Sequence, residues 1–152
     1  MTDQKTIQIL LEEYTRGAGT WPIEPSEFAS WAVRVKHWMP TVEASIKLCA
    51  EQFSRAMREE YTTDSAGRRI RTKHAVRIMR GKQQIVLWDD LPTAPRSHMV
   101  RAFQQRRDGI VGDCRQLKND VDSYNDAHTD MSPIQLILDF TLDMQELEHR
   151  AA

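Results

Sequence analysis

Several features are scarce in this sequence, and each scarcity excludes a class of protein. Only two of the 152 residues are cysteines, Cys49 and Cys114, so a small secreted domain held together by disulfides is not expected. No apolar run approaches the roughly 18 residues that a membrane helix needs. The first residues also lack the basic-then-apolar order of a signal peptide. We therefore expect a cytoplasmic protein that does not enter a membrane, with both cysteines reduced and packed in the core.

Catalytic and metal-binding motifs are missing as well. The five histidines show no close ligand spacing and no C-x-x-C pair occurs, so no zinc site is expected. No nucleophile elbow, phosphate-binding loop or dinucleotide-binding glycine pattern is present. Asp89 and Asp90 are neighbours, but adjacent residues of a strand point to opposite faces. We expect no enzymatic activity, no cofactor and no metal, and we name no catalytic residue.

The composition supports a folded chain, and its charge is unevenly distributed. Hydrophobic residues make up 40% and charged residues 28%, which is enough to build a core. The net charge of -1 is the sum of three segments of different charge: residues 1–30 carry -3, residues 31–118 carry +9 and residues 119–152 carry -7. Such a separation indicates a partner for the basic middle. The acidic C-terminal block is itself a candidate for that partner, in the same chain or in a second copy.

Hydrophobic spacing predicts three helices in the first part of the chain. Apolar residues recur at helical intervals over residues 3–16, 25–38 and 41–60. Pro25 suits the first turn of the second helix. Residues 62–67, TTDSAG, have the composition of a turn.

The period then changes from helical to alternating in GRRIRTKHAVRI, residues 67–78. Alternation over this length predicts a strand, and the β-branched run 83–89 is expected to pair back with it through the MRGK turn at 79–82. The inner face includes His74, which we expect to be packed and hydrogen bonded. The outer face is cationic, and no acid occurs between Ala66 and Trp88. The bases of this run are Arg68, Arg69, Arg71, Lys73, Arg77, Arg80 and Lys82.

A long helix is predicted at about 96–127, with apolar residues at heptad spacing. This pattern indicates a coiled coil or a helical hairpin. Arg107 interrupts the seam, and Gly109 and Gly112 each cost about 1 kcal/mol relative to alanine in a helix interior. The residues expected at an oligomer interface are Val100, Phe103, Ile110, Cys114, Leu117, Val121 and Tyr124.

The last predicted helix starts at Ser132 and ends near residue 148, because Ser132, Pro133 and Gln135 resemble a capping box with a first-turn proline. The expected fold is mainly α with one β-hairpin (α+β). It comprises three N-terminal helices, a central basic hairpin, a long helix and a shorter C-terminal helix. We expect residues 1–92 to form a helical domain with the hairpin. Residues 93–152 would form a helical oligomerisation segment, which could pack on the first part as one domain.

Three helices followed by a basic hairpin resemble a winged-helix DNA-binding domain. The resemblance covers roughly residues 3–90 and concerns the order of the elements and the charge of the hairpin. It implies that the hairpin is a wing whose seven bases contact phosphates of DNA or RNA. Two departures are visible: the third helix is long for a recognition helix, and its exposed face mixes both charge signs.

Two functions are compatible with these patterns. In the first, the chain binds nucleic acid through the basic hairpin, and the heptad helix makes it a dimer. In the second, it is a protein-interaction or assembly module, in which the heptad helix and the acidic C-terminal helix pack on a second copy or on another protein. The acidic segment 119–149 could also fold over the hairpin as a mask.

Overall fold

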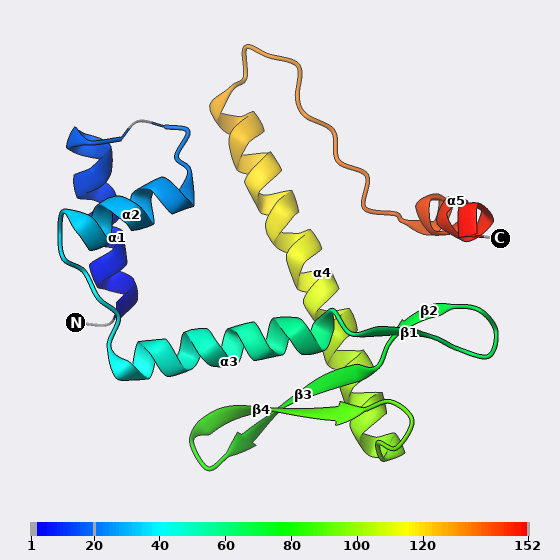
Figure 1. The fold of residues 1–152 in the computed structure, drawn as a ribbon. Helices are drawn as coiled ribbons and strands as arrows, with labels where there is room; N and C mark the ends of the chain where they lie inside the picture. Colours follow the sequence, from blue (N-terminus) through cyan, green and yellow to red (C-terminus); the bar gives the residue numbers. More distant parts are fainter. Residues whose placement is uncertain (1–2, 20, 152) are drawn as a thin grey trace. The chain divides into compact units, whose positions relative to one another are not determined.

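The structure, a computed structural model, describes residues 3–19 and 21–151. Among these residues it contains five α-helices and two antiparallel strand pairs (Figure 1). This confirms the predicted mainly helical fold with β structure in the middle. The chain divides into two compact units, Met1–Glu60 and Tyr61–Ala152. The first is helical, and the second contains the strands and the two remaining helices. The predicted domain division after residue 92 stays a prediction.

The first unit begins with two short helices that share a small aromatic core. Helix α1 covers Asp3–Gly17 and helix α2 covers Pro25–Arg34, so α2 ends four residues before the predicted position. The ring of Tyr14 lies 5.5 Å from that of Phe28 and 5.3 Å from that of Trp31, between centroids. Tilted ring pairs at this spacing are favourable, so Tyr14 joins the two helices.

Helix α3 covers Val42–Arg58 and leaves most of its apolar side chains exposed. It starts at Thr41, whose hydroxyl oxygen accepts a hydrogen bond from the backbone N–H of Ala44 at 3.1 Å. The helix has no buried residue, and Phe53 is 68% exposed. The predicted core position of Cys49 is wrong, because this side chain is exposed.

The cationic run forms parts of two hairpins instead of one strand. Strand β1 (Tyr61–Thr63) pairs with β2 (Arg69–Arg71), and β3 (Lys73–Arg80) pairs with β4 (Gln83–Asp90). The continuous strand predicted for residues 69–78 is therefore interrupted at Thr72, where the chain passes from one hairpin to the other.

The first hairpin was not expected, since residues 62–67 were predicted to be only a turn. A shorter turn is held by Asp64, whose carboxylate oxygen accepts the backbone N–H groups of Ala66 and Arg68, both at 2.9 Å. Gly67 adopts a φ of 78°, which a side chain would disfavour. Because the turn is short, the residues on either side of it can pair as strands.

The second hairpin forms as the alternation predicts. Arg80 pairs with Gln83, and Gly81, at a φ of 64°, lies in the two-residue connection between them. His74 and Val76 are buried on the inner face, which confirms the predicted packing of His74. In Figure 1 this hairpin lies against the first part of helix α4, which covers Arg96–Ala127 as predicted.

The C-terminal helix starts later than predicted. Helix α5 covers Thr141–Ala151, and residues 132–140 have no regular secondary structure. Asn125 near the end of α4 bonds both backbone groups of Ile134: its Oδ1 accepts from the N–H at 2.9 Å and its Nδ2 donates to the carbonyl at 3.0 Å. In a helix starting at Ser132, the Ile134 carbonyl would accept the N–H of Leu138, so its bond to Asn125 takes an acceptor that such a helix would use. Just before α5, the Asp139 carboxylate accepts the N–H of Thr141 at 3.1 Å.

Candidate functional site

Helix α4 is fastened to strand β3 by two polar side chains and one buried contact. The side-chain amide of Gln105 accepts a hydrogen bond from the N–H of Arg77 at 2.8 Å and donates one to the Arg77 carbonyl at 2.9 Å. It thus bonds both backbone groups of Arg77, as a residue of a neighbouring strand would. One face of α4 therefore packs against the β3–β4 hairpin. Two turns earlier, His98 Nε2 donates to the carbonyl of His74 at 2.9 Å. Between these two positions Ala102 is only 3% exposed.

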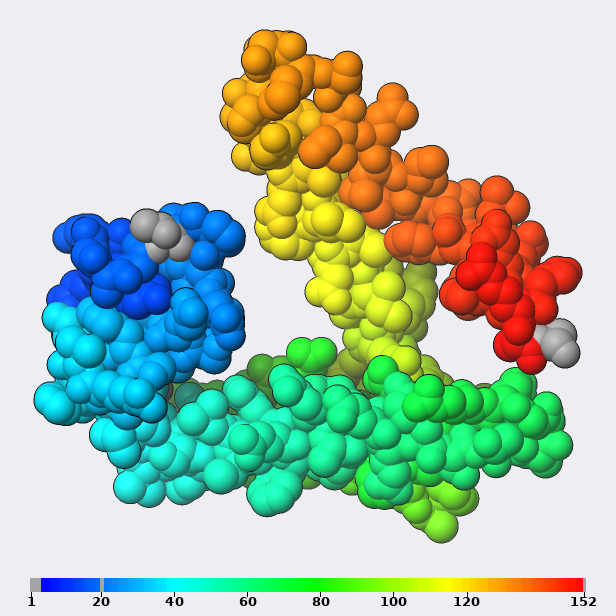
Figure 2. Space-filling view, turned by 45° about the horizontal axis from the view of Figure 1, so that its top comes forward, coloured from blue at the N-terminus to red at the C-terminus, as the bar shows by residue number. Residues whose placement is uncertain are grey.

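The predicted oligomer interface lies along α4, with most of its apolar side chains exposed. Ile110 is 54% exposed and Leu117 is 46% exposed, while Cys114 and Val121 are half-buried. Figure 2 shows the surface of the middle turns of α4, drawn in yellow. We define the heptad seam as the predicted set, which consists of Val100, Phe103, Ile110, Cys114, Leu117, Val121 and Tyr124.

The two glycines of α4 do not interrupt the heptad seam. If Arg107 and Cys114 occupy the first position of successive heptads, Gly109 takes the third and Gly112 the sixth. Both positions lie outside the contact stripe, and a Cβ built at either glycine meets nothing within 4 Å. The glycines therefore lower helix propensity without removing a seam contact.

Two seam residues already have partners within the second unit. The ring of Phe103 meets His74 edge-on, with centroids 5.1 Å apart. At the other end, Tyr124 stacks on His128 at 4.1 Å. The part of the seam between them, from Ile110 to Val121, has no such aromatic contact among the described residues.

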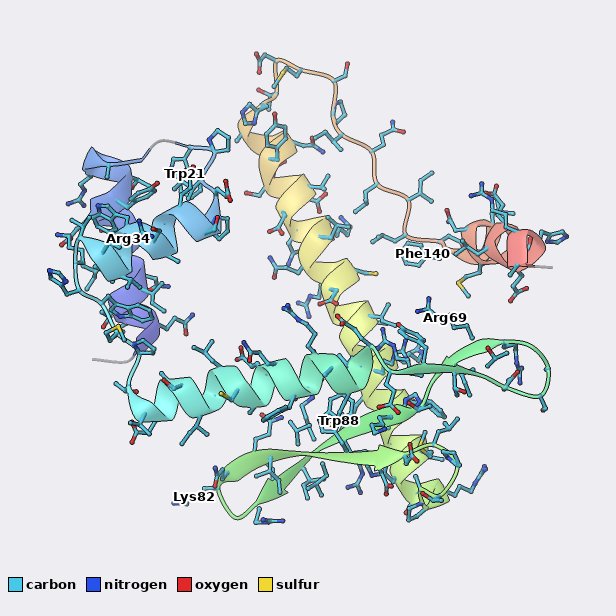
Figure 3. The ribbon with its side chains drawn as sticks, viewed as in Figure 1. Trp21, Arg34, Arg69, Lys82, Trp88 and Phe140 are labelled. Carbon is cyan, nitrogen blue, oxygen red and sulfur yellow. The ribbon has the colours of Figure 1, made fainter. Side chains whose placement is uncertain are left out.

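The seven predicted phosphate-contacting cations are divided between the two hairpins. Arg68 pairs with Asp64 at 2.8 Å, close to the β1–β2 turn. Lys73 lies 3.9 Å from Asp90, its cross-strand neighbour. Figure 3 shows Arg69 and Lys82 on different hairpins. The seven bases do not form one continuous row, as a single strand would have required.

Arg69 and Arg71 are positioned by an aromatic ring. The guanidinium carbon of Arg69 lies 3.9 Å from the centroid of Tyr61, and Arg71 Nε donates to the Tyr61 hydroxyl at 3.2 Å. Arg77, Arg80 and Lys82 are exposed on the second hairpin, Arg77 within β3 and the other two at the turn.

His74 lies where both hairpins meet α4. Its Nε2 donates to the carbonyl of Arg71 at 3.0 Å. Burial lowers the pKa of His74 below its usual 6.5, and the positive charges of Arg106 and Arg71 lower it further. The hydrogen bond to the Arg71 carbonyl acts in the opposite direction, and the net shift of the pKa is downward, toward the neutral imidazole.

The side chains that fasten the second unit together could not be identified from sequence. Gln105 bonds across 28 positions, His98 across 24 and Asn125 across nine. No local pattern distinguishes these residues from their neighbours. Arg106 was also missed, since its approach to His74 depends on the packing of α4 against the hairpins.

Within residues 3–19 and 21–151, no cluster of three or more metal-ligating side chains occurs, and no helix is long and apolar enough to cross a membrane. No protein-family model matches the chain, and neither the curated proteins nor the solved structures contain a match. The resemblance to a winged-helix domain stays a prediction.

Proposed function

We propose that this chain is a protein-assembly module that pairs with a second copy of itself through helix α4. The observation that supports this is the exposed heptad seam. Ile110 and Leu117 are seven residues apart on one continuous helix, and about half of each side chain is exposed. An apolar stripe with this period is buried most simply against another helix with the same period.

The charged residues beside the seam favour a parallel pair of identical helices. Asp113 occupies the last position of its heptad, and Lys118 the fifth position of the next. In a parallel, in-register pair, Asp113 of one copy faces Lys118 of the second copy. Each pair of helices would form this attractive contact twice. Lys118 also contacts Asp122 on its own helix, so the interhelical contact extends an existing ion pair.

Arg107 occupies a seam position and gives the pairing a register. A basic residue at one apolar layer lowers stability but disfavours helix alignments that would bury it against apolar layers. Arg107 is close to its neighbour Asp108, with 3.8 Å between nitrogen and oxygen. The apolar layers that follow, from Ile110 onward, would supply the affinity.

The native cysteine Cys114 tests this arrangement. In the Cys49→Ala variant, Cys114 is the only thiol, and parallel pairing brings two copies of it to the same layer. Mild oxidation is expected to give a covalent dimer quickly in buffer and slowly in urea. For the control, Cys114→Ala and Gln116→Cys are added, which moves the thiol to the outer face of α4. Equal cross-linking of the two variants would contradict pairing through the seam.

Nucleic-acid binding is a second candidate, supported by the run of bases that lacks acids. Arg77, Arg80 and Lys82 are exposed and lie on one hairpin. If they contact phosphates, affinity for duplex DNA, single-stranded DNA or RNA falls steeply with salt. Fluorescence anisotropy at two salt concentrations measures this.

A charge-reversal variant tests whether the tip of the second hairpin is responsible. Arg80→Glu with Lys82→Glu is expected to weaken binding and to reduce the salt dependence by about one unit of slope per lost contact. The matched control reverses Lys47 and Arg55, two exposed bases of α3. Binding that both pairs of substitutions weaken equally would exclude the hairpin as the contact surface.

A further inference from the structure

A cavity of about 350 Å³ lies where the two hairpins meet helix α4. Its walls come mainly from β1, β2, β3 and α4, all within the second unit. Small-molecule sites in proteins start at roughly 300 Å³, so the cavity has room for a small ligand. The lining residues that matter here are Tyr61, Arg69, Arg71, His74, Phe103 and Arg106.

The cavity wall contains three arginines and no acidic residue. Among the described residues, none of Arg69, Arg71 and Arg106 has a carboxylate within 4.0 Å. This differs from Arg68, which is neutralised by Asp64. Three cations without a counter-charge around one cavity favour an anion inside it.

Two of these arginines are held in place before any ligand arrives. The Tyr61 ring stacks against Arg69, and its hydroxyl accepts a hydrogen bond from Arg71 Nε. That bond leaves the two terminal nitrogens of Arg71 available as donors. Side chains that are already ordered lose less entropy on binding, which raises affinity.

The positive charges of the cavity wall also act on the His74 ring. The charges of Arg106 and Arg71 both lower its pKa, so both arginines act on the same point of the wall. His98 on α4 acts in the same direction, while Asp89 is the cross-strand partner of His74 on β4.

We propose that this cavity binds a phosphate monoester, either a phosphorylated small molecule or the terminal phosphate of a nucleic acid. A phosphate dianion accepts several hydrogen bonds, and the planar guanidinium group donates two of them in parallel. Three arginines match the double negative charge of a phosphate monoester better than the single negative charge of a carboxylate ligand. Phe103 adds an apolar wall for the rest of the ligand. The argument for this site does not rest on pairing through α4, although Phe103 belongs to both the cavity wall and the heptad seam.

The first probes are a nucleoside monophosphate and the corresponding nucleoside, titrated into the full chain by calorimetry. Only the phosphorylated compound is expected to bind. Arg106→Gln should weaken its binding about tenfold or more, because a charged hydrogen-bond donor is lost. Arg115→Gln is the matched control, since Arg115 lies on α4 outside both the heptad seam and the cavity wall. Circular dichroism shows whether both variants fold.

A second readout keeps the proposal testable if Arg106→Gln does not fold. Bound phosphate places negative charge near His74, so its pKa, followed by NMR, should rise on addition of the nucleoside monophosphate. Binding of an oligonucleotide with a 5′-phosphate is compared with binding of the same oligonucleotide without it. This comparison shows whether the phosphate is the end of a nucleic acid or part of a small molecule. No binding of either phosphorylated probe would overturn the proposal. Equal losses in Arg106→Gln and Arg115→Gln would also overturn it, because the cavity would not be the site.

Discussion

The substitution Leu117→Lys is expected to disrupt pairing through α4. Leu117 is 46% exposed in the single chain, so about half of its side chain remains to be buried in a pair. Complete burial of a leucine contributes about 1.5–3 kcal/mol. Two copies, each burying half of Leu117, gain about the same amount on pairing, and Leu117→Lys removes this part of the binding free energy. Each 1.4 kcal/mol corresponds to tenfold in affinity, which gives a loss of roughly 10- to 100-fold. Two lysines in the same layer repel each other and increase the loss.

The assay is sedimentation equilibrium over a range of concentrations, with Gln116→Lys as the control. Gln116 is adjacent to Leu117 on the outer face of α4, where its amide donates to Asp120 at 2.9 Å. Gln116→Lys introduces the same charge and should leave the dissociation constant within a few-fold of the original. If the two variants weaken association equally, or neither does, the heptad seam is not the interface and the argument from its exposure is refuted.

Three further predictions concern the second unit. Gln105→Ala should lower its stability by about 1–2 kcal/mol, because two hydrogen bonds to Arg77 are lost; thermal unfolding and faster exchange of the Arg77 amide proton measure this. Asn125→Ala should release Ile134, detected as faster amide exchange there and faster proteolysis of residues 132–140, while α4 stays helical. Folding lowers the pKa of His74, so the unfolded chain takes up its proton first and the free energy of unfolding should fall as pH drops below 6.5. Urea unfolding at pH 7 and 5.5 checks the sign.

The elements with strong periodicity could be predicted from sequence. Helix α4 has the predicted bounds, and the second hairpin has the predicted inner face. Its turn lies within the predicted segment 79–82 but is shorter, because Met79 and Arg80 still belong to β3. The break at Thr72 could not be predicted, since the alternation passes through it without change. What interrupts the strand is a second partner, β1, that pairs with only part of the run.

The C-terminal segment shows how tertiary contacts override a local signal. Ser132, Pro133 and Gln135 resemble a helix start, yet the chain there is not helical. Asn125 bonds both backbone groups of Ile134, and this bond depends on the return of the chain toward α4. Propensity describes a segment in isolation and cannot include such a partner.

The candidate sites were predictable to different degrees. The heptad seam follows from spacing alone, although the contact of Phe103 with His74 does not. The cations were visible as a run without acids. Some of these bases have carboxylate partners and others line the cavity. Which base falls in which group depends on the residues of β1 and α4 that pack close to it. Arg106 is the clearest case, since nothing in its local sequence relates it to residues 69–74.

The mass of the unmodified chain in solution tests the central claim most directly. One chain has a mass of 17.7 kDa. Sedimentation equilibrium should show a reversible increase to twice this value as concentration rises, with little change at high salt because the seam is apolar. A mass of 17.7 kDa at every concentration would contradict pairing through α4.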